Sequence, residues 1–103
     1  MSEKNNQLPP SLESSVPKEL FKAEVRSWAE KIGVQFNSIT VRPMTKKWAS
    51  CSSKGNLTFD MGLLVKPADF RRKAIVHELL HLKYPTHNKL FEALERAYVE
   101  GDA

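Results

Sequence analysis

The chain has little cysteine and no long apolar run. Its single cysteine, Cys51, cannot form a disulfide within one chain, which is typical of proteins from a reducing compartment. No apolar stretch approaches the ~20 residues that a membrane-spanning helix needs, and the polar residues 1–7 lack the apolar run of a signal peptide. We therefore expect a cytoplasmic protein without a membrane partner.

The chain also lacks a strong excess of charge of one sign. Its net charge is +4 at pH 7 and its pI is about 9.3. The positive charge is spread along the sequence, apart from clusters at residues 46–47 and 71–73. This distribution is typical of a solvated surface, and it indicates contact with a nucleic acid only weakly. A length of 103 residues predicts one domain, which we expect to be a monomer.

Composition predicts how that domain is bounded. Residues 1–16 are polar and contain Pro9-Pro10 and several serines, which indicates a flexible tail. Residues 17–103 form the predicted domain. An apolar fraction of 41% is enough for one modest core, and a bound metal would add to the stability of so short a chain.

The first half of the domain reads as a helix followed by short strands. Apolar residues at helical spacing predict a helix over residues 17–32, with Pro17 at its start and Gly33 at its end. Residues that favour strands follow in three segments: 34–41, 48–52 and 57–59. We interpret them as a small three-stranded antiparallel sheet.

The second half reads as two helices separated by a break. The first is predicted over residues 67–83, with a C-terminal half so apolar that it should be buried. Pro85 cannot continue that helix. Thr86 is a plausible N-cap for a last helix over residues 87–100. The predicted fold class is therefore α+β.

The most informative segment is His77-Glu78-Leu79-Leu80-His81, an HExxH motif within the second predicted helix. Histidines four residues apart lie on one helical face, about 5–6 Å apart at Cβ, so both rings can reach one Zn²⁺. Glu78 flanks that position. A carboxylate there can take a proton from a metal-bound water and pass it to the leaving amine.

A catalytic zinc needs a third protein ligand and an open position. His87 is the best candidate, because the chain stops being helical before Pro85 and can turn back toward the metal. All three histidines of the chain are then used in one place. Glu92 and Glu95 are alternative third ligands, although each also fits an ordinary solvated helix face.

These motifs resemble those of the YgjP-like metallopeptidase family, which is related to the WLM and SprT-like zinc peptidases. The similarity runs from Trp48-Ala49-Ser50-Cys51-Ser52 through Gly55 and Asp60 to the HExxH motif and His87-Asn88-Lys89-Leu90-Phe91. It implies a minimal zincin-like fold with His77, His81 and His87 as zinc ligands and Glu78 as the general base. Ala49 stands where that family usually has glycine, and Asp60 where we expect asparagine.

The spacing of the three histidines also equals that of metzincins. Metzincins, however, have glycine where this chain has Tyr84, and they need a methionine-containing turn after the third histidine. No methionine follows His87. We therefore reject that assignment.

Three further residues are candidates for substrate binding. In zincins an edge strand above the metal pairs with an extended substrate, and Trp48 and Ser50 would then line the cleft. Tyr84 could stabilise an oxyanion. The alternatives are core packing for Trp48 and a plain helix-terminal role for Tyr84. Cys51 could ligate zinc, although a lone cysteine is more often a small buried hydrophobic residue.

The sequence thus predicts a zinc-dependent metallopeptidase that hydrolyses peptide bonds through a metal-bound water with Glu78 as general base. Its expected cofactor is Zn²⁺ and its expected partner is a peptide or protein substrate. Two alternatives remain open. One is a nucleic-acid-associated, SprT-like protease, and the other is a non-catalytic domain that zinc only stabilises.

Overall fold

The computed structural model describes residues 16–100. Its elements, in chain order, are α2 (Lys18–Ile32), β1 (Ser38–Arg42), β2 (Ala49–Cys51), β3 (Asn56–Asp60), the short 3₁₀ helix η1 (Met61–Val65), α3 (Ala68–His81) and α4 (Lys89–Val99). The predicted flexible tail, residues 1–16, lies outside the described residues except for Val16. That residue is half-buried, and its N–H donates to the carbonyl oxygen of Leu64 at 2.8 Å.

Helix α2 forms where its apolar spacing predicts it. Phe21, Val25 and Ala29 recur on one face and are buried against the rest of the molecule. The helix ends at Gly33, which has a φ of 85° and donates its N–H to the Ala29 carbonyl oxygen. Glycine suits this left-handed position because it has no Cβ to clash. The prediction of a helix over residues 17–32 is confirmed to within one residue.

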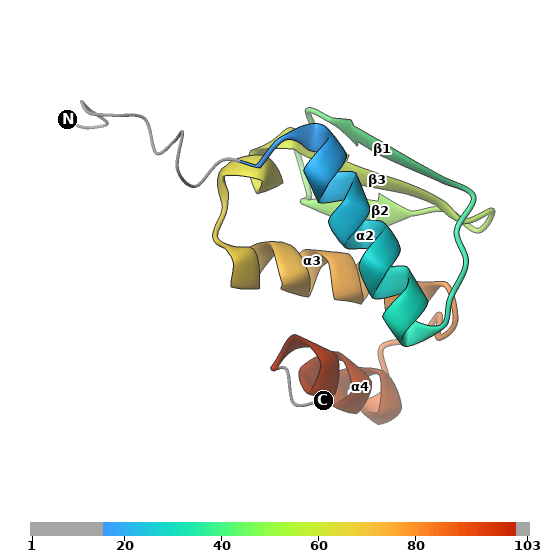
Figure 1. Ribbon diagram of the computed structural model, residues 1–103. Coiled ribbons are helices and arrows are strands. Elements are labelled where there is room, and N and C mark those ends of the chain that lie inside the picture. Colours follow the sequence, from blue (N-terminus) through green and yellow to red (C-terminus); the bar gives the residue numbers. More distant parts are fainter. Residues whose placement is uncertain (1–15, 101–103) are drawn as a thin grey trace.

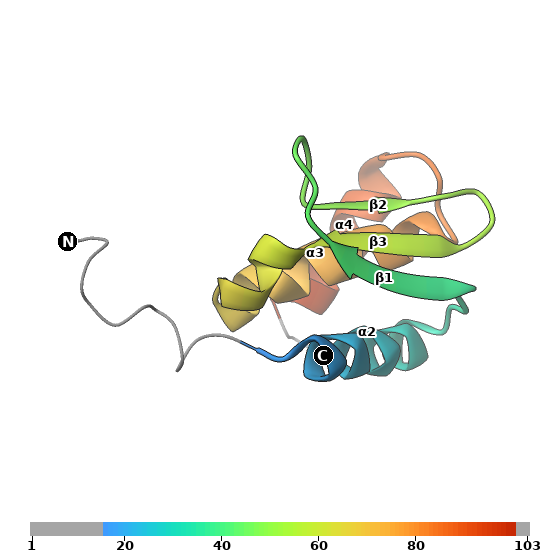
Figure 2. The same cartoon turned by 90° about the horizontal axis from the view of Figure 1, so that it is seen from above.

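The three strands form a mixed sheet, so the prediction of an antiparallel sheet is wrong for one of its two pairings. The strand order is β1-β3-β2, in which β2 and β3 are antiparallel but β1 and β3 are parallel (Figure 2). The physical reason lies in burial: Leu57 and Phe59 of β3 are completely buried, so β3 takes the centre. The segment between β1 and β2 therefore crosses to the far side of β3, and no pattern in the sequence specifies that crossing.

Asp60 fixes the end of the central strand. Its Oδ1 accepts a hydrogen bond from the Met44 N–H at 2.7 Å, and its Oδ2 accepts one from the Gly62 N–H at 3.0 Å. The first bond holds the segment that follows β1, and the second caps η1. A Cβ at position 62 would lie only 2.6 Å from Asp60 Oδ2 and 3.0 Å from the Trp48 ring. Glycine at 62 is therefore required by close approach.

Helix α3 packs under the sheet, and α4 lies on the side of α3 that faces away from the sheet (Figure 1). Ile75, Val76, Leu79 and Leu80 of α3 are completely buried, which confirms the predicted burial of its C-terminal half. Between the helices, Arg72 Nη1 donates to the Val99 carbonyl oxygen at 2.8 Å. Within residues 16–100, no helix is long and apolar enough to cross a membrane.

The start of the last helix differs from the prediction. Asn88 is the N-cap, and its Oδ1 accepts the Phe91 N–H at 2.9 Å. Thr86 is not the N-cap, and His87 lies in the connecting loop. Asparagine caps better than threonine, and two more residues of loop let the chain turn before α4 begins. This shift is what frees His87 from helical geometry.

Candidate metal centre and active site

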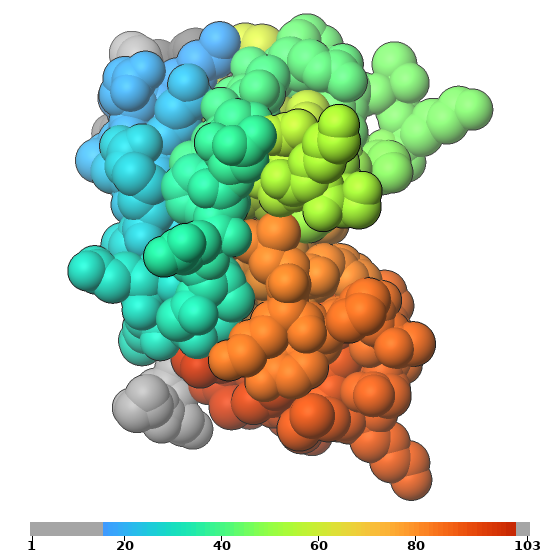
Figure 3. Space-filling view, turned by 90° about the vertical axis from the view of Figure 1, so that its right-hand side faces the viewer, coloured from blue at the N-terminus to red at the C-terminus, as the bar shows by residue number. Residues whose placement is uncertain are grey.

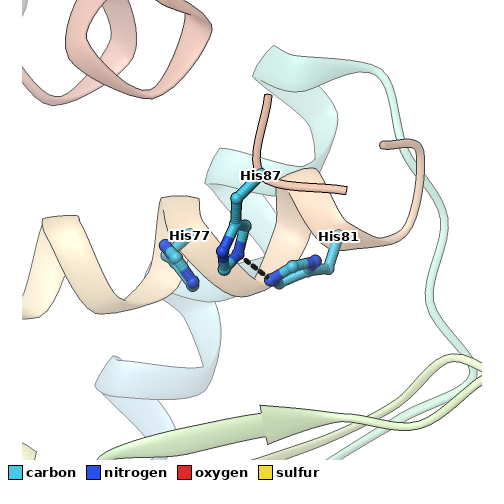
Figure 4. A group of neighbouring side chains, drawn as sticks. All are labelled: His77, His81 and His87. Carbon is cyan, nitrogen blue, oxygen red and sulfur yellow. Dashed lines mark hydrogen bonds between the residues drawn. The ribbon is translucent and has the colours of Figure 1, made fainter. Parts of the chain in front are cut away.

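Helix α3 and the loop after it bring the three histidines together. His77 and His81 project from the same face of α3, with ring centroids 4.9 Å apart, and His87 reaches the same point from the loop (Figure 4). The Nε2 atoms of His87 and His81 are 2.7 Å apart. One candidate ligand atom from each histidine lies within 4.8 Å of the other two. The predicted convergence of the three rings is therefore present in the structure.

The donor set fits a tetrahedral metal ion. Zn–N bonds of 2.0–2.1 Å at tetrahedral angles would separate two ligand nitrogens by about 3.3 Å. The observed 2.7 Å between His81 and His87 differs from this by an amount that small ring rotations can supply. Three neutral imidazoles are a common ligand set for zinc and leave a fourth position open. Glu92 and Glu95 are not part of this group of ligand atoms.

Local structure explains the return of His87. The Tyr84 N–H donates to the Leu80 carbonyl oxygen at 2.7 Å and closes α3. The Asn88 N–H donates to the Thr86 carbonyl oxygen at 2.9 Å, which turns the loop just before α4. The break at Pro85 thus becomes a compact turn that directs His87 back over α3.

Phe91 supports all three histidine rings. Its own ring is 1% exposed, and its centroid lies 5.2 Å from that of His77, 5.0 Å from His81 and 4.7 Å from His87. An apolar ring in contact with three imidazoles restricts their rotation and excludes water from that side. In the sequence, Phe91 stood out only as the last residue of the segment 87–91, and no pattern indicated its contact with the histidine rings.

Glu95 of α4 holds the far side of His77. Its Oε2 lies 2.9 Å from His77 Nδ1, and its side chain is 18% exposed. From the sequence, Glu95 was an alternative third metal ligand, but in the structure its carboxylate contacts a histidine instead. A signal for this role exists in the sequence, because Glu95 lies four residues after Phe91 and so on the same, mostly apolar, helix face.

Glu78 faces two pockets that open beside the histidines. Burial raises the pKa of its carboxyl above the ordinary value, although His77 and Lys47 oppose that shift. Within residues 16–100, no group donates a hydrogen bond to the Glu78 carboxylate. This carboxylate therefore keeps its lone pairs available.

The two pockets differ in chemistry. The apolar pocket has a volume of 360 Å³ and is lined by Lys47, Trp48, Ala49, Phe70, Lys73, Ala74, His77, Glu78 and Glu95. The polar pocket is lined by Lys47, Ala49, Ser50, Cys51, Ser52, Ser53, Glu78, His81 and Pro85. It lies where the yellow-green residues around the β2–β3 turn face the orange residues at the end of α3 (Figure 3).

The candidate substrate-binding residues fall in different places. Trp48 lines the apolar pocket and is 41% exposed, and Ser50 lines the polar pocket. Tyr84 lines neither of these two pockets and packs, partly buried, against the core. Sequence reasoning did not single out Lys47 or Phe70 as pocket residues: Phe70 lies on α3 two turns before Glu78, but the contact of both residues with Trp48 in one pocket depends on the packing of α3 against β2.

The pKa values of two further side chains at the site are also shifted. Burial, together with His77 and His87, lowers the pKa of His81, which favours the neutral imidazole that a metal requires. Burial, and then the negative charge of Glu78, raises the pKa of the Cys51 thiol. Cys51 Sγ donates to the Ser52 carbonyl oxygen at 3.5 Å and does not belong to the histidine group.

The structure is similar to two crystal structures of metallopeptidase zymogens from archaea. The first is abylysin of Pyrococcus abyssi, with 22% identity and a TM-score of 0.66, covering 78% of this chain and 85% of that chain. The second is jannalysin of Methanocaldococcus jannaschii, with 25% identity and a TM-score of 0.68, covering 76% of this chain and 80% of that chain. These likenesses support the α+β metallopeptidase fold.

Comparison with curated proteins finds no match. Comparison with protein families finds one that matches residues 3–101, nearly the whole length, and it is described as the YgjP-like metallopeptidase domain. The fold, the three convergent histidines and this match agree with one another. The chain belongs to the YgjP-like family of metallopeptidase domains.

Proposed function

We propose that the protein is a zinc peptidase in which His77, His81 and His87 hold the metal and Glu78 is the general base. The observation that carries this proposal is the convergence of three imidazoles beside the half-buried carboxylate of Glu78, to which no residue between 16 and 100 donates a hydrogen bond. When bound, zinc would polarise the substrate carbonyl and lower the pKa of a water molecule toward about 7. Proton transfer, orientation of the ligands and binding of the substrate backbone would be carried out by residues of the chain.

We propose that Glu78 transfers a proton in two steps, first from water to its carboxylate and then from its carboxyl to the leaving amine. In its ionised form it accepts a proton from the attacking water, and it then gives that proton to the amine that leaves. Its position suits both steps, because Glu78 lines both pockets beside His77 and His81, and no described residue donates a hydrogen bond to its carboxylate.

Glu95 is proposed to position His77. A carboxylate that accepts the Nδ1–H of a histidine fixes the tautomer, so that Nε2 stays unprotonated and free to ligate a metal. The 2.9 Å contact to His77 Nδ1 has the geometry for this. Glu95 would thereby act on the metal through His77 and not as a ligand.

Strand β2 is proposed to bind the substrate backbone. The residues on either side of this strand bond to β3, since the Asp60 N–H donates to the Trp48 carbonyl oxygen at 2.8 Å and the Ser52 N–H donates to the Asn56 carbonyl oxygen at 3.0 Å. Bonding alternates along an antiparallel strand, so the backbone groups of Ala49 and Cys51 point away from β3. They are available to an extended peptide lying between β2 and the histidines.

The decisive experiment combines metal analysis with peptide hydrolysis. The purified full chain should contain one zinc per molecule and should cleave peptides in a digest, and a chelator should stop the cleavage. Glu78→Gln should keep the zinc and lose activity by about 10²–10⁴-fold. Zinc binding without any hydrolysis by the wild type would favour the non-catalytic, zinc-stabilised alternative.

A further inference from the structure

The two pockets flank Glu78 along the direction of β2. Trp48, at the start of the strand, lines the apolar pocket, whereas Ser52, just past its end, lines the polar pocket. Glu78 lines both pockets. A peptide that lies along β2 with its scissile bond at Glu78 would therefore place side chains of opposite character in the two pockets.

Two aromatic rings, those of Trp48 and Phe70, form one wall of the apolar pocket. Trp48 and Phe70 pack edge to face with centroids 5.1 Å apart, and both are more than a third exposed. Lys66 Nζ lies 5.1 Å from the Trp48 centroid and 5.0 Å from that of Phe70, which stabilises the pair through cation–π attraction. Two large exposed rings beside a candidate metal centre indicate a surface that binds apolar groups.

The orientation of β2 gives the substrate its direction. Antiparallel pairing is slightly more stable per residue than parallel pairing, and β2 has its free edge toward the substrate. A peptide antiparallel to β2 runs from the Ser52 end toward the Trp48 end. Its residues before the scissile bond then lie near the polar pocket, and those after it lie near the apolar pocket.

We propose that the apolar pocket binds a bulky apolar side chain, aromatic or leucine-like, of the residue immediately C-terminal to the scissile bond. The polar pocket binds a small polar side chain on the N-terminal side. This proposal rests on the proposed peptidase function, which it deepens by naming the substrate class. Burial of one large apolar side chain should raise kcat/KM by about 10–100-fold over alanine at that position.

A pocket-filling variant tests the proposal. Ala74 lines the apolar pocket, one helical turn before Glu78. Zinc-loaded Ala74→Phe should fill the pocket and lose most of the preference for phenylalanine over alanine, measured as the ratio of kcat/KM for the two peptides. Ala93→Phe makes the same change on the exposed face of α4 and should keep the wild-type preference. An unchanged preference in Ala74→Phe would overturn the proposal.

A digest of a peptide library by the wild-type protein shows on which side of the cleaved bond the apolar residue lies. Enrichment of phenylalanine, leucine or methionine directly after the cleaved bond supports the proposal. Enrichment only before the bond, or none at all, overturns it.

Measuring peptide binding to an inactive variant distinguishes the pocket proposal from the peptidase proposal. Zinc-loaded Glu78→Gln should bind a phenylalanine peptide about 10–100-fold more tightly than its alanine counterpart, measured by calorimetry. Preferential binding without cleavage by the wild type would support the pocket while rejecting the peptidase. Equal binding of the two peptides would reject the pocket, whatever the wild type cleaves.

Discussion

Glu95 Oε2 lies 2.9 Å from His77 Nδ1, which places a carboxylate from α4 behind a histidine from α3. The two residues are on different helices, and their contact crosses the α3–α4 interface. This interface therefore stabilises the fold and also fixes the orientation of one ring in the candidate metal centre.

The Glu95 contact predicts a loss of metal affinity in Glu95→Gln. The amide has no charge to stabilise the Nδ1–H of His77, so zinc affinity should fall by about 10–100-fold. Competition with a chromophoric chelator measures this directly, without any substrate. Glu92→Gln, on the exposed side of the same helix, is the matched control and should bind zinc like the wild type. Equal affinities in the two variants would remove Glu95 from its positioning role.

The three-histidine arrangement predicts that zinc stabilises the fold. At a free zinc concentration of 1,000 times Kd, binding should add about 4 kcal/mol to the free energy of unfolding. His87→Ala should lose most of that gain, because only two protein ligands remain. Thermal unfolding with and without zinc gives the measurement. A full zinc-dependent shift in His87→Ala would show that the third ligand is another residue.

The raised pKa of Glu78 predicts that the free energy of unfolding of the metal-free protein depends on pH. Because the folded-state pKa lies above the unfolded-state value of about 4.3, the native state binds more protons, and stability falls as pH rises through that window. The loss of stability is complete once the pH exceeds the folded-state pKa. Metal-free Glu78→Gln should therefore be more stable than the wild type at pH 7.

This difference in stability should shrink as pH falls below about 4.3, where the carboxyl is protonated in both states. Denaturant unfolding of both proteins across pH provides the check. A metal-free Glu78→Gln that is less stable than the wild type at pH 7 contradicts the prediction. Such an outcome would mean that the carboxylate stabilises the fold.

Asp60 gives a prediction about stability alone. Both of its oxygens accept backbone N–H groups, from Met44 and Gly62. Asparagine offers only one acceptor oxygen, so Asp60→Asn should destabilise the protein by about 1.5–3 kcal/mol, the range for hydrogen bonds to charged groups. Asp69→Asn is a control, because among residues 16–100 the Asp69 side chain accepts a hydrogen bond only from the exposed N–H of the next residue, Phe70. Denaturant midpoints distinguish the two variants.

The same contacts give Asp60 a role that the sequence alone did not reveal. The sequence shows Asp60 where relatives are expected to have asparagine, and it gives no reason for the change. In the structure the carboxylate joins the segment after β1 to the start of η1. That segment crosses the sheet, which local patterns did not predict, so the role of Asp60 could not be inferred before the topology was known.

Local sequence patterns determined most of the secondary structure and the nature of the site. The spacing of His77 and His81 fixes both rings on one helix face, since helical periodicity is a property of the chain itself. Pro85 ends α3 for an equally local reason. From these features alone the sequence predicted a metal centre with a glutamate beside it.

Only the tertiary structure decided which distant groups complete that centre. Glu95 contacts His77, and Phe91 lies against all three histidine rings, because α4 packs on α3. Likewise, β1 pairs with β3 in parallel because the segment after β1 crosses to the other side of β3, where β2 runs antiparallel to both. Such contacts depend on how whole elements bury their apolar faces against one another, and no periodicity within a single element specifies that arrangement.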